Sequence, residues 1–285
     1  MIDLLTLGQA FKQNGYTIAR ALFSAEEAAR YRDHFMALRE SASYQGDLVN
    51  QWDDGETDPL KRYPRMFNMH RWDEMSRRWL LDERIRRCMV AMLDREPYAI
   101  QTMLYFKPPG SRGQALHQDQ YYLRARPGTS IAAWMALDPI DEANGCLQMV
   151  PNTQDLPLIC PEQADEAASF TTIAVPLPPG LQPVPMILAP GDVLFFNGQI
   201  IHGSFPNTTR DRFRRSLVGH YIEGHAQQVA AFDHPVLRMD GTVVTEMAAS
   251  PDGGECGVWV DHDGRHLVEI NQLYETAGAL ETLPL

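Results

Sequence analysis

The segment Leu116-His117-Gln118-Asp119 places an imidazole and a carboxylate two residues apart. Side chains two apart on an extended strand point to the same face, so an extended H-x-D segment directs both groups to one point. On a helix, the same spacing would direct them apart. A histidine and an aspartate that converge in this way are suitable ligands for a divalent metal, and a third ligand must come from elsewhere in the chain.

The best candidate for the third ligand is His202. It follows a predicted strand at residues 193–196, and the next residue, Gly203, permits a tight turn. The rival is His220, which we interpret as a histidine of a predicted strand at residues 216–222. Two histidines and one carboxylate leave metal positions open for a bidentate co-substrate and O2, which suits Fe(II). Zinc hydrolases can use the same ligands, so the ligand set alone leaves both metals open.

A basic residue downstream of His202 points to an anionic co-substrate. The far carboxylate of 2-oxoglutarate needs a fixed cation inside a narrow barrel, because an unpaired buried charge is costly. Arginine suits this role, since it stays charged and binds carboxylates through two hydrogen bonds. Arg214 stands at the start of a predicted strand, and Ser204 offers a hydroxyl donor nearby. The alternative is that Arg214 belongs to a solvated cluster with its neighbours Arg210, Arg212 and Arg215.

Composition narrows the possible partners. The chain has 285 residues and a formal net charge of −12, and its estimated pI is 5.2. This balance argues against binding to nucleic acid or to an anionic membrane surface. We expect no membrane span and no secretory signal, because no apolar run approaches the roughly 18 residues that a span needs. The four widely spaced cysteines predict free thiols in a reducing cytoplasm: Cys88, Cys146, Cys160 and Cys256.

The first 96 residues are expected to form a mainly helical layer. Capping signals place three helices, and we expect them at residues 4–14 (closed by Gly15), 25–39 (after a Ser24/Glu27 capping box) and from Asp73 to Leu93. A short strand is predicted at residues 16–19, and residues 47–64 have the turn-rich composition of a functional loop.

From residue 97 onwards, short apolar runs alternate with Gly, Pro, Asn and Asp, which favours strands. The predicted strands are residues 99–106, 130–137, 147–150, 171–175, 184–188, 192–196 and 216–222. The segment 224–285 adds predicted strands at residues 242–246, 257–260 and 266–270, which we interpret as hairpins and pocket elements. The prediction is one domain, residues 1–285, that is mainly β with flanking helices and has a jelly-roll core at residues 97–223.

Four blocks of sequence, in order, resemble the phytanoyl-CoA dioxygenase family of Fe(II)/2-oxoglutarate-dependent dioxygenases. They are residues 101–110 with 116–119, residues 133–138, residues 144–147, and His202-Gly203-Ser204 with Asn207 and Phe213-Arg214-Arg215. The blocks cover roughly residues 101–221. The resemblance implies a double-stranded β-helix (a cupin-like jelly roll) and the cofactors Fe(II), 2-oxoglutarate and O2.

The resemblance also implies roles for particular residues. The iron ligands are His117, Asp119 and His202, and the 2-oxoglutarate contacts are Met103, Trp134, Ser204 and Arg214. Met103 and Trp134 have the alternative role of core residues, and Arg215 is the alternative to Arg214. The family has a further 2-oxoglutarate contact near the N-terminus. Because the carboxylate ligand is present, whereas related halogenases have a small residue there, we expect a hydroxylase or another oxygenase.

The expected reaction is hydroxylation of a C–H bond in a small-molecule metabolite, with release of succinate and CO2. Gln118, Tyr121 and Tyr122 are the candidate substrate contacts, and an exposed loop is the alternative for the two tyrosines. Two other functions remain open: a zinc- or manganese-dependent cupin that acts as a hydrolase or isomerase, and a non-catalytic jelly-roll binding module. The oligomeric state, monomer or homo-oligomer, is also left open.

Overall fold

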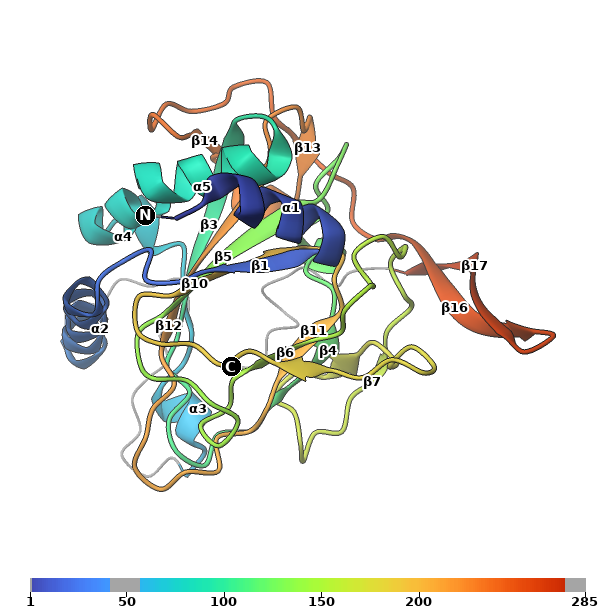
Figure 1. Ribbon diagram of the computed structural model, residues 1–285, viewed down its shortest axis with the longest axis horizontal. Helices are drawn as coiled ribbons and strands as arrows, with labels where there is room; N and C mark the ends of the chain where they lie inside the picture. Colours follow the sequence, from blue (N-terminus) through green and yellow to red (C-terminus); the bar gives the residue numbers. More distant parts are fainter. Residues whose placement is uncertain (1, 42–56, 275–285) are drawn as a thin grey trace.

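Two antiparallel sheets form the centre of the computed structural model, which describes residues 2–41 and 57–274 (Figure 1). The larger sheet has the order β1 (Tyr16–Ala19), β10 (Val193–Asn197), β5 (Ser130–Ala136), β12 (Ser216–Glu223), β3 (Pro97–Tyr105) and β14 (Leu237–Arg238), with β2 (Met66–Phe67) also paired to β3. The smaller sheet has the order β4 (Gln114–His117), β11 (His202–Ser204), β6 (Leu147–Met149) and β9 (Val184–Pro185). This arrangement confirms the predicted jelly roll.

The two sheets pack through a buried apolar layer. The larger sheet supplies Met103, Trp134 and Val218, and the smaller sheet supplies Leu147 and Met149. Strand β12 lies between β3 and β5, so residues at the middle of the larger sheet are fixed by hydrogen bonds on both sides. This central position makes β12 a rigid support for any side chain that faces the smaller sheet.

Helices cover the outer face of the larger sheet (Figure 1). They are α1 (Leu4–Asn14), α2 (Ala25–Glu40), α4 (Glu74–Leu80) and α5 (Glu83–Leu93). The predicted caps are present: Gly15 adopts a left-handed φ of 76° after α1, and Ser24 and Glu27 form the reciprocal capping box of α2. Trp79, Leu80 and Met89 are buried against this face of the sheet.

Some local predictions were wrong. The single helix expected from Asp73 to Leu93 is interrupted at Leu81 and Asp82, because the Asp82 side chain accepts a hydrogen bond from the Arg84 backbone and caps a new helix. Residues 242–246 form no strand and contribute only an isolated bridge from Val243 to Leu237.

The predicted loop at residues 47–64 falls largely outside the described residues. Its described part contains the short helix α3 (Pro59–Arg62), which begins with a proline behind the capping residue Asp58. The remaining short elements are η1 (Met69–Arg71), α6 (Gln120–Leu123), β7 (Glu162–Gln163), β8 (Ile173–Ala174), β13 (Gln228–Val229), η2 (Ala231–Asp233) and β15 (Ala248–Ala249).

A hairpin of β16 (Gly254–His262) and β17 (Arg265–Tyr274) extends from the body of the protein (Figure 1). A disulfide joins Cys160 to Cys256 of β16, so the prediction that all four cysteines are free thiols was wrong. The cause is proximity that the wide sequence spacing hides: Cys160 donates a backbone hydrogen bond to Gly257, which brings the two chain segments together. Cys88 and Cys146 are free and buried. Within the described ranges, no helix combines the length and apolar character needed to cross a membrane.

Candidate active site

The three predicted metal ligands converge between the sheets. His117 ends β4, His202 begins β11, and the two residues are direct partners in the antiparallel pairing of these strands. Asp119 lies just beyond the strand as the capping residue of α6, with φ −60° and ψ −33°. The predicted geometry of one extended H-x-D segment was therefore wrong at Asp119, where the chain has already turned into a helical conformation. The turn nevertheless brings its carboxylate back to the two imidazoles.

Backbone carbonyls orient both imidazoles. The Nδ1 of His117 lies 2.9 Å from the carbonyl oxygen of Ala115, and the Nδ1 of His202 lies 3.0 Å from that of Ile200. A carbonyl can only accept, so each Nδ1 carries the proton and each Nε2 keeps its lone pair. Such outer partners are the usual means of fixing the tautomer of a metal-binding histidine.

The Nε2 atoms of both imidazoles approach the same carboxylate oxygen. The Nε2 atoms of His117 and His202 lie 3.5 and 3.7 Å from Oδ1 of Asp119, and one ligand atom from each residue lies within 4.8 Å of the others. The amide of Gln114 also donates to Nε2 of His117. Among the described residues, His117, Asp119 and His202 are the histidine, cysteine or acidic side chains whose geometry could hold a metal ion.

Burial and charge set the protonation of the ligands. Burial alone would raise the pKa of Asp119, but His202, His117 and His220 together hold it well below its usual range. Burial, and secondarily the neighbouring His117, lower the pKa of His202 to about 4. At neutral pH the site therefore offers a carboxylate and an unprotonated imidazole, the forms that bind a metal. Two imidazoles and a carboxylate fit Fe(II).

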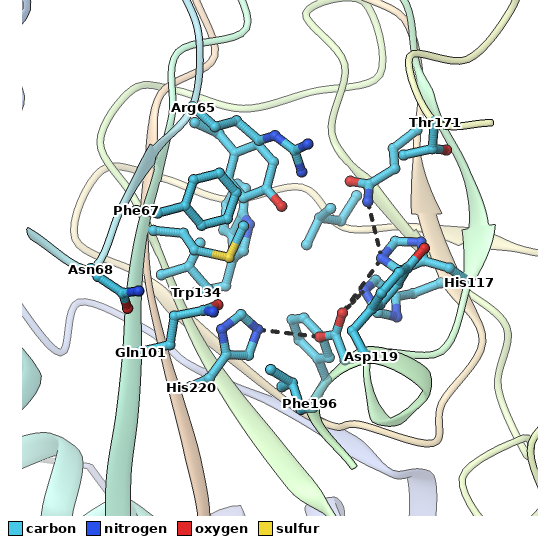
Figure 2. Close-up of a pocket in the computed structure, with 18 of the residues that line it drawn as sticks. Arg65, Phe67, Asn68, Gln101, His117, Asp119, Trp134, Thr171, Phe196 and His220 are labelled. Carbon is cyan, nitrogen blue, oxygen red and sulfur yellow. Dashed lines mark hydrogen bonds and ion pairs between the residues drawn. The ribbon is translucent and has the colours of Figure 1, made fainter. Parts of the chain in front are cut away.

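The ligands line a cavity of about 360 Å³ (Figure 2). Of the other predicted site residues, Met103, Trp134, Tyr122 and Arg214 also line it. The 2-oxoglutarate candidates and the metal ligands thus share one enclosed space between the two sheets.

Arg214 is a buried cation without a carboxylate partner within the described part of the chain. Its side chain donates to the carbonyl of Gly145 and to the hydroxyl of Ser216, and it lies over the ring of Trp134. Burial lowers the pKa of Arg214 to about 10, so the guanidinium is still charged at neutral pH. An uncompensated buried charge is costly, so the Arg214 guanidinium is a candidate partner for an anionic group in the cavity.

Its neighbour Arg215 points elsewhere. The Arg215 guanidinium binds the carboxylate of Asp138 at 2.7 Å, and its side chain is absent from the cavity lining. The structure therefore separates the two arginines that the sequence leaves as alternatives: one opens into the cavity and one is neutralised outside it.

Ser204 does not line the cavity. Its hydroxyl accepts a hydrogen bond from the Nζ of Lys107 at 2.9 Å and another from the backbone of Gln114. Burial, and secondarily Arg214, hold the pKa of Lys107 well below its ordinary value. Lys107 and Ser204 thus form a polar pair next to Arg214 behind the cavity wall.

Gln118 and Tyr121 also lie outside the cavity lining. The Gln118 amide donates to the carbonyls of Pro157 and Gln199 and accepts from the backbone of Ile159, so it connects its own turn to the segment 157–159 and to Gln199. Tyr121 stacks on Tyr274 of β17 with ring centroids 4.6 Å apart. The side chains of Gln118 and Tyr121 therefore contact other protein groups and do not face the cavity.

Sequence reasoning missed several cavity residues. The most informative of these are Arg65, Phe67, Tyr105, Gln114, Phe196 and Thr171. Arg65 lies 5.0–5.5 Å from the rings of Phe67, Tyr105 and Phe170, and no carboxylate pairs with it in the residues described. Arg65 lies far upstream of the H-x-D segment, and no local sequence pattern indicates that it faces the cavity. Tyr105 could have been indicated by its place on β3, because it stands two residues after Met103 and therefore points to the same face of the strand.

Comparison with known proteins agrees with this geometry. The family described as phytanoyl-CoA dioxygenase (PhyH) matches residues 11–216. Peroxisomal phytanoyl-CoA dioxygenase of Bos taurus is 27% identical over 245 residues, which cover 80% of this chain and 71% of that protein. Phytanoyl-CoA dioxygenase 1 of Oryza sativa is 24% identical over 228 residues, or 69% of this chain and 81% of that protein.

Solved structures share the fold. EvdO2 from Micromonospora carbonacea, complexed with 2-oxoglutarate, has a TM-score of 0.58 and 23% identity, and the match covers 79% of this chain and 92% of EvdO2. The α-ketoglutarate-dependent epimerase SnoN from nogalamycin biosynthesis has a TM-score of 0.60 and 21% identity, with 78% and 84% of the two chains covered. The chain thus belongs to the phytanoyl-CoA dioxygenase family and is a 2-oxoglutarate-dependent non-haem iron dioxygenase that uses Fe(II), 2-oxoglutarate and O2.

Proposed function

We propose that this protein hydroxylates a C–H bond of a small-molecule metabolite, with His117, Asp119 and His202 as the iron ligands. The observation that carries the proposal is the shared cavity, in which the buried, unpaired guanidinium of Arg214 faces the same space as the triad. Fe(II) with 2-oxoglutarate, when bound, supplies the activation of O2 with release of succinate and carbon dioxide.

The chain itself orients the co-substrate. Arg214 binds the distal carboxylate of 2-oxoglutarate, and Trp134 and Met103 form the apolar wall along its carbon chain. Ser204 supports 2-oxoglutarate binding indirectly. It accepts a hydrogen bond from Lys107, and this bond fixes the polar side chains next to Arg214. Arg65 is our candidate for the family's N-terminal contact with 2-oxoglutarate, because it is a cation on the cavity wall that no described carboxylate neutralises.

The remaining cavity residues select the substrate. Tyr122 lies next to His117, with ring centroids 6.5 Å apart, and burial raises its pKa, so its hydroxyl remains protonated. The aromatic side chains Phe67, Phe196 and Phe232 supply apolar surface to the cavity, and Phe196 lies against His202 with ring centroids 4.6 Å apart. A cavity that combines this apolar surface with charged and polar side chains suits a small organic substrate that carries polar groups of its own.

The test is a panel of metabolites incubated with Fe(II), 2-oxoglutarate and O2. Succinate formation together with the gain of one oxygen atom in a panel member is expected. Succinate that forms while the product instead loses two hydrogens would contradict hydroxylation and retain the oxygenase class. His202→Ala is the matched control, because it removes one ligand and should abolish substrate-dependent succinate formation.

A further inference from the structure

We propose that His220 is a positioning residue for the metal centre: it holds the second oxygen of Asp119 so that the first oxygen faces the metal. The inference rests on the metal site in the proposed function. It concerns a histidine that the sequence offers as a rival ligand, and the structure gives it a different place. The Nε2 of His220 lies 3.4 Å from Oδ2 of Asp119, whereas His117 and His202 both approach Oδ1.

The two oxygens of Asp119 therefore have different neighbours. Oδ1 lies on the side of the two imidazoles whose Nε2 atoms keep a lone pair, which in His117 accepts from the Gln114 amide. Oδ2 lies on the side of His220, which points toward Asp119 from a different wall of the cavity (Figure 2). A carboxylate held by one oxygen binds a metal through the other, which keeps a coordination position open for a bidentate co-substrate and O2.

His220 is well placed to fix this geometry. It belongs to β12 of the larger sheet, where it pairs with Gln101 of β3 on one side and Ala132 of β5 on the other. Its ligand neighbours come from the smaller sheet and from the turn after β4. His220 thus connects the larger sheet to Asp119, in the turn that follows β4 of the smaller sheet, and it is 5% exposed.

The hydrogen-bond partners of His220 distinguish it from the two ligand histidines. His117 and His202 each have a carbonyl acceptor for Nδ1, which frees Nε2. The Nδ1 of His220 is buried and has no hydrogen-bond partner in the described part of the protein. In the proposed role, Nε2 of His220 carries the proton and directs its N–H toward Oδ2 of Asp119, which lies 3.4 Å away and can only accept. An Nε2 that donates a hydrogen has no lone pair for a metal.

Outer partners of this kind have measurable effects: their loss costs about 10–100-fold in metal affinity or activity. The asymmetry of Asp119 completes a consistent pattern, in which each of the three ligands is oriented by a partner that does not touch the metal. For the histidines the partners are the carbonyls of Ala115 and Ile200, which mutation cannot remove. His220 is the side-chain partner and is therefore the one that substitution can test.

The experiment measures Mn²⁺ binding by titration calorimetry, without 2-oxoglutarate or substrate. His220→Phe keeps a ring but removes both nitrogens, and it should raise the Kd for Mn²⁺ by about 10–100-fold. His220→Gln places an amide N–H near the position of Nε2 and should restore a Kd close to that of the wild type. Val218→Ala is the control, because Val218 faces the same cavity two residues earlier on β12 and has no polar group.

Each outcome decides the matter. A wild-type Kd in the Phe variant, or an equal loss in the Phe and Gln variants, would overturn a hydrogen-bonding role. Complete loss of binding in both would show that His220 is itself a ligand. Thermal unfolding of each variant without metal identifies a folding defect, and the Gln variant remains informative if the Phe variant is unstable. If the wild type binds no Mn²⁺, the proposed metal centre fails first, so the two failures are distinguishable.

Discussion

His117 and His202 are direct partners across strands β4 and β11, and the centroids of their imidazole rings lie 4.2 Å apart. The spacing of the two nitrogen ligands is thus set by backbone pairing, which holds neighbouring strands at a nearly fixed distance. Only the third ligand, Asp119, depends on a turn. The pairing within the smaller sheet therefore places two of the three ligands, and the turn after β4 places the third.

Replacement of Arg214 should weaken 2-oxoglutarate binding. Arg214→Gln removes the buried charge that faces the cavity, and hydrogen bonds to charged groups contribute about 1.5–3 kcal/mol, so the Kd should rise by roughly 10–150-fold. Binding is measured by calorimetry at saturating Mn²⁺. Arg215→Gln is the matched control and should leave this Kd unchanged, since Arg215 pairs with Asp138 outside the cavity. A raised Kd in the Arg215→Gln variant and an unchanged Kd in the Arg214→Gln variant would show that Arg215 binds 2-oxoglutarate instead.

Loss of the disulfide should destabilise the protein. Cys160 and Cys256 are separated by 96 residues, and a crosslink that closes such a loop contributes about 2–4 kcal/mol. Cys160→Ser, Cys256→Ser and the double variant should share one lowered Tm, because all three remove the same bond. A dithiol reductant should lower the wild-type Tm to that value and leave the variants unchanged. A wild-type Tm in the Cys256→Ser variant would contradict a stabilising role.

Acid should weaken the fold through His70. Burial, with smaller effects of Arg71 and Arg77, lowers the pKa of His70 from its ordinary value of 6.5 to about 4. The unfolded chain therefore binds more protons between these values, so stability is complete above about pH 6.5 and falls as pH decreases toward 4. At about pH 5 the loss is roughly 2 kcal/mol, since each pKa unit corresponds to about 1.4 kcal/mol.

The measurement for His70 is urea unfolding at about pH 7 and about pH 5. The His70→Phe variant should show a smaller loss of unfolding free energy between the two values than the wild type, because it has no group to titrate there. An equal loss in both proteins would assign the acid sensitivity to other groups. The comparison is between slopes, so a constant cost from the lost hydrogen bond to Thr102 does not affect it.

The sequence predicts the fold well where the signals are local. The Gly15 cap, the Ser24/Glu27 box and the apolar runs at residues 99–106 and 216–222 are short-range patterns, and the structure confirms the elements that they predict. The break between α4 and α5 was missed, because Asp82 reads equally well as a helix residue and as a cap. Pairing of Cys160 with Cys256 was missed because it depends on how two distant segments meet.

The candidate site also contains residues that local patterns predict and residues that they do not. His117, Asp119 and His202 are found from residue type and motif order, and they converge although Asp119 is not extended. Arg65 and His220 carry no motif, since each becomes a cavity residue only when β12 and the segment before β2 pack beside β3. Positions of this kind follow from topology, which single-sequence patterns do not contain.

The central claim is that three side chains bind Fe(II) beside a guanidinium that binds 2-oxoglutarate. The most direct measurement is anaerobic addition of Fe(II) and 2-oxoglutarate, followed by the visible charge-transfer absorption of the chelate. The wild type should show this band, and His202→Ala and Asp119→Ala should lose it while remaining folded. A wild-type band in the His202→Ala variant would contradict the ligand assignment, and its absence from the wild-type protein would contradict the metal site altogether.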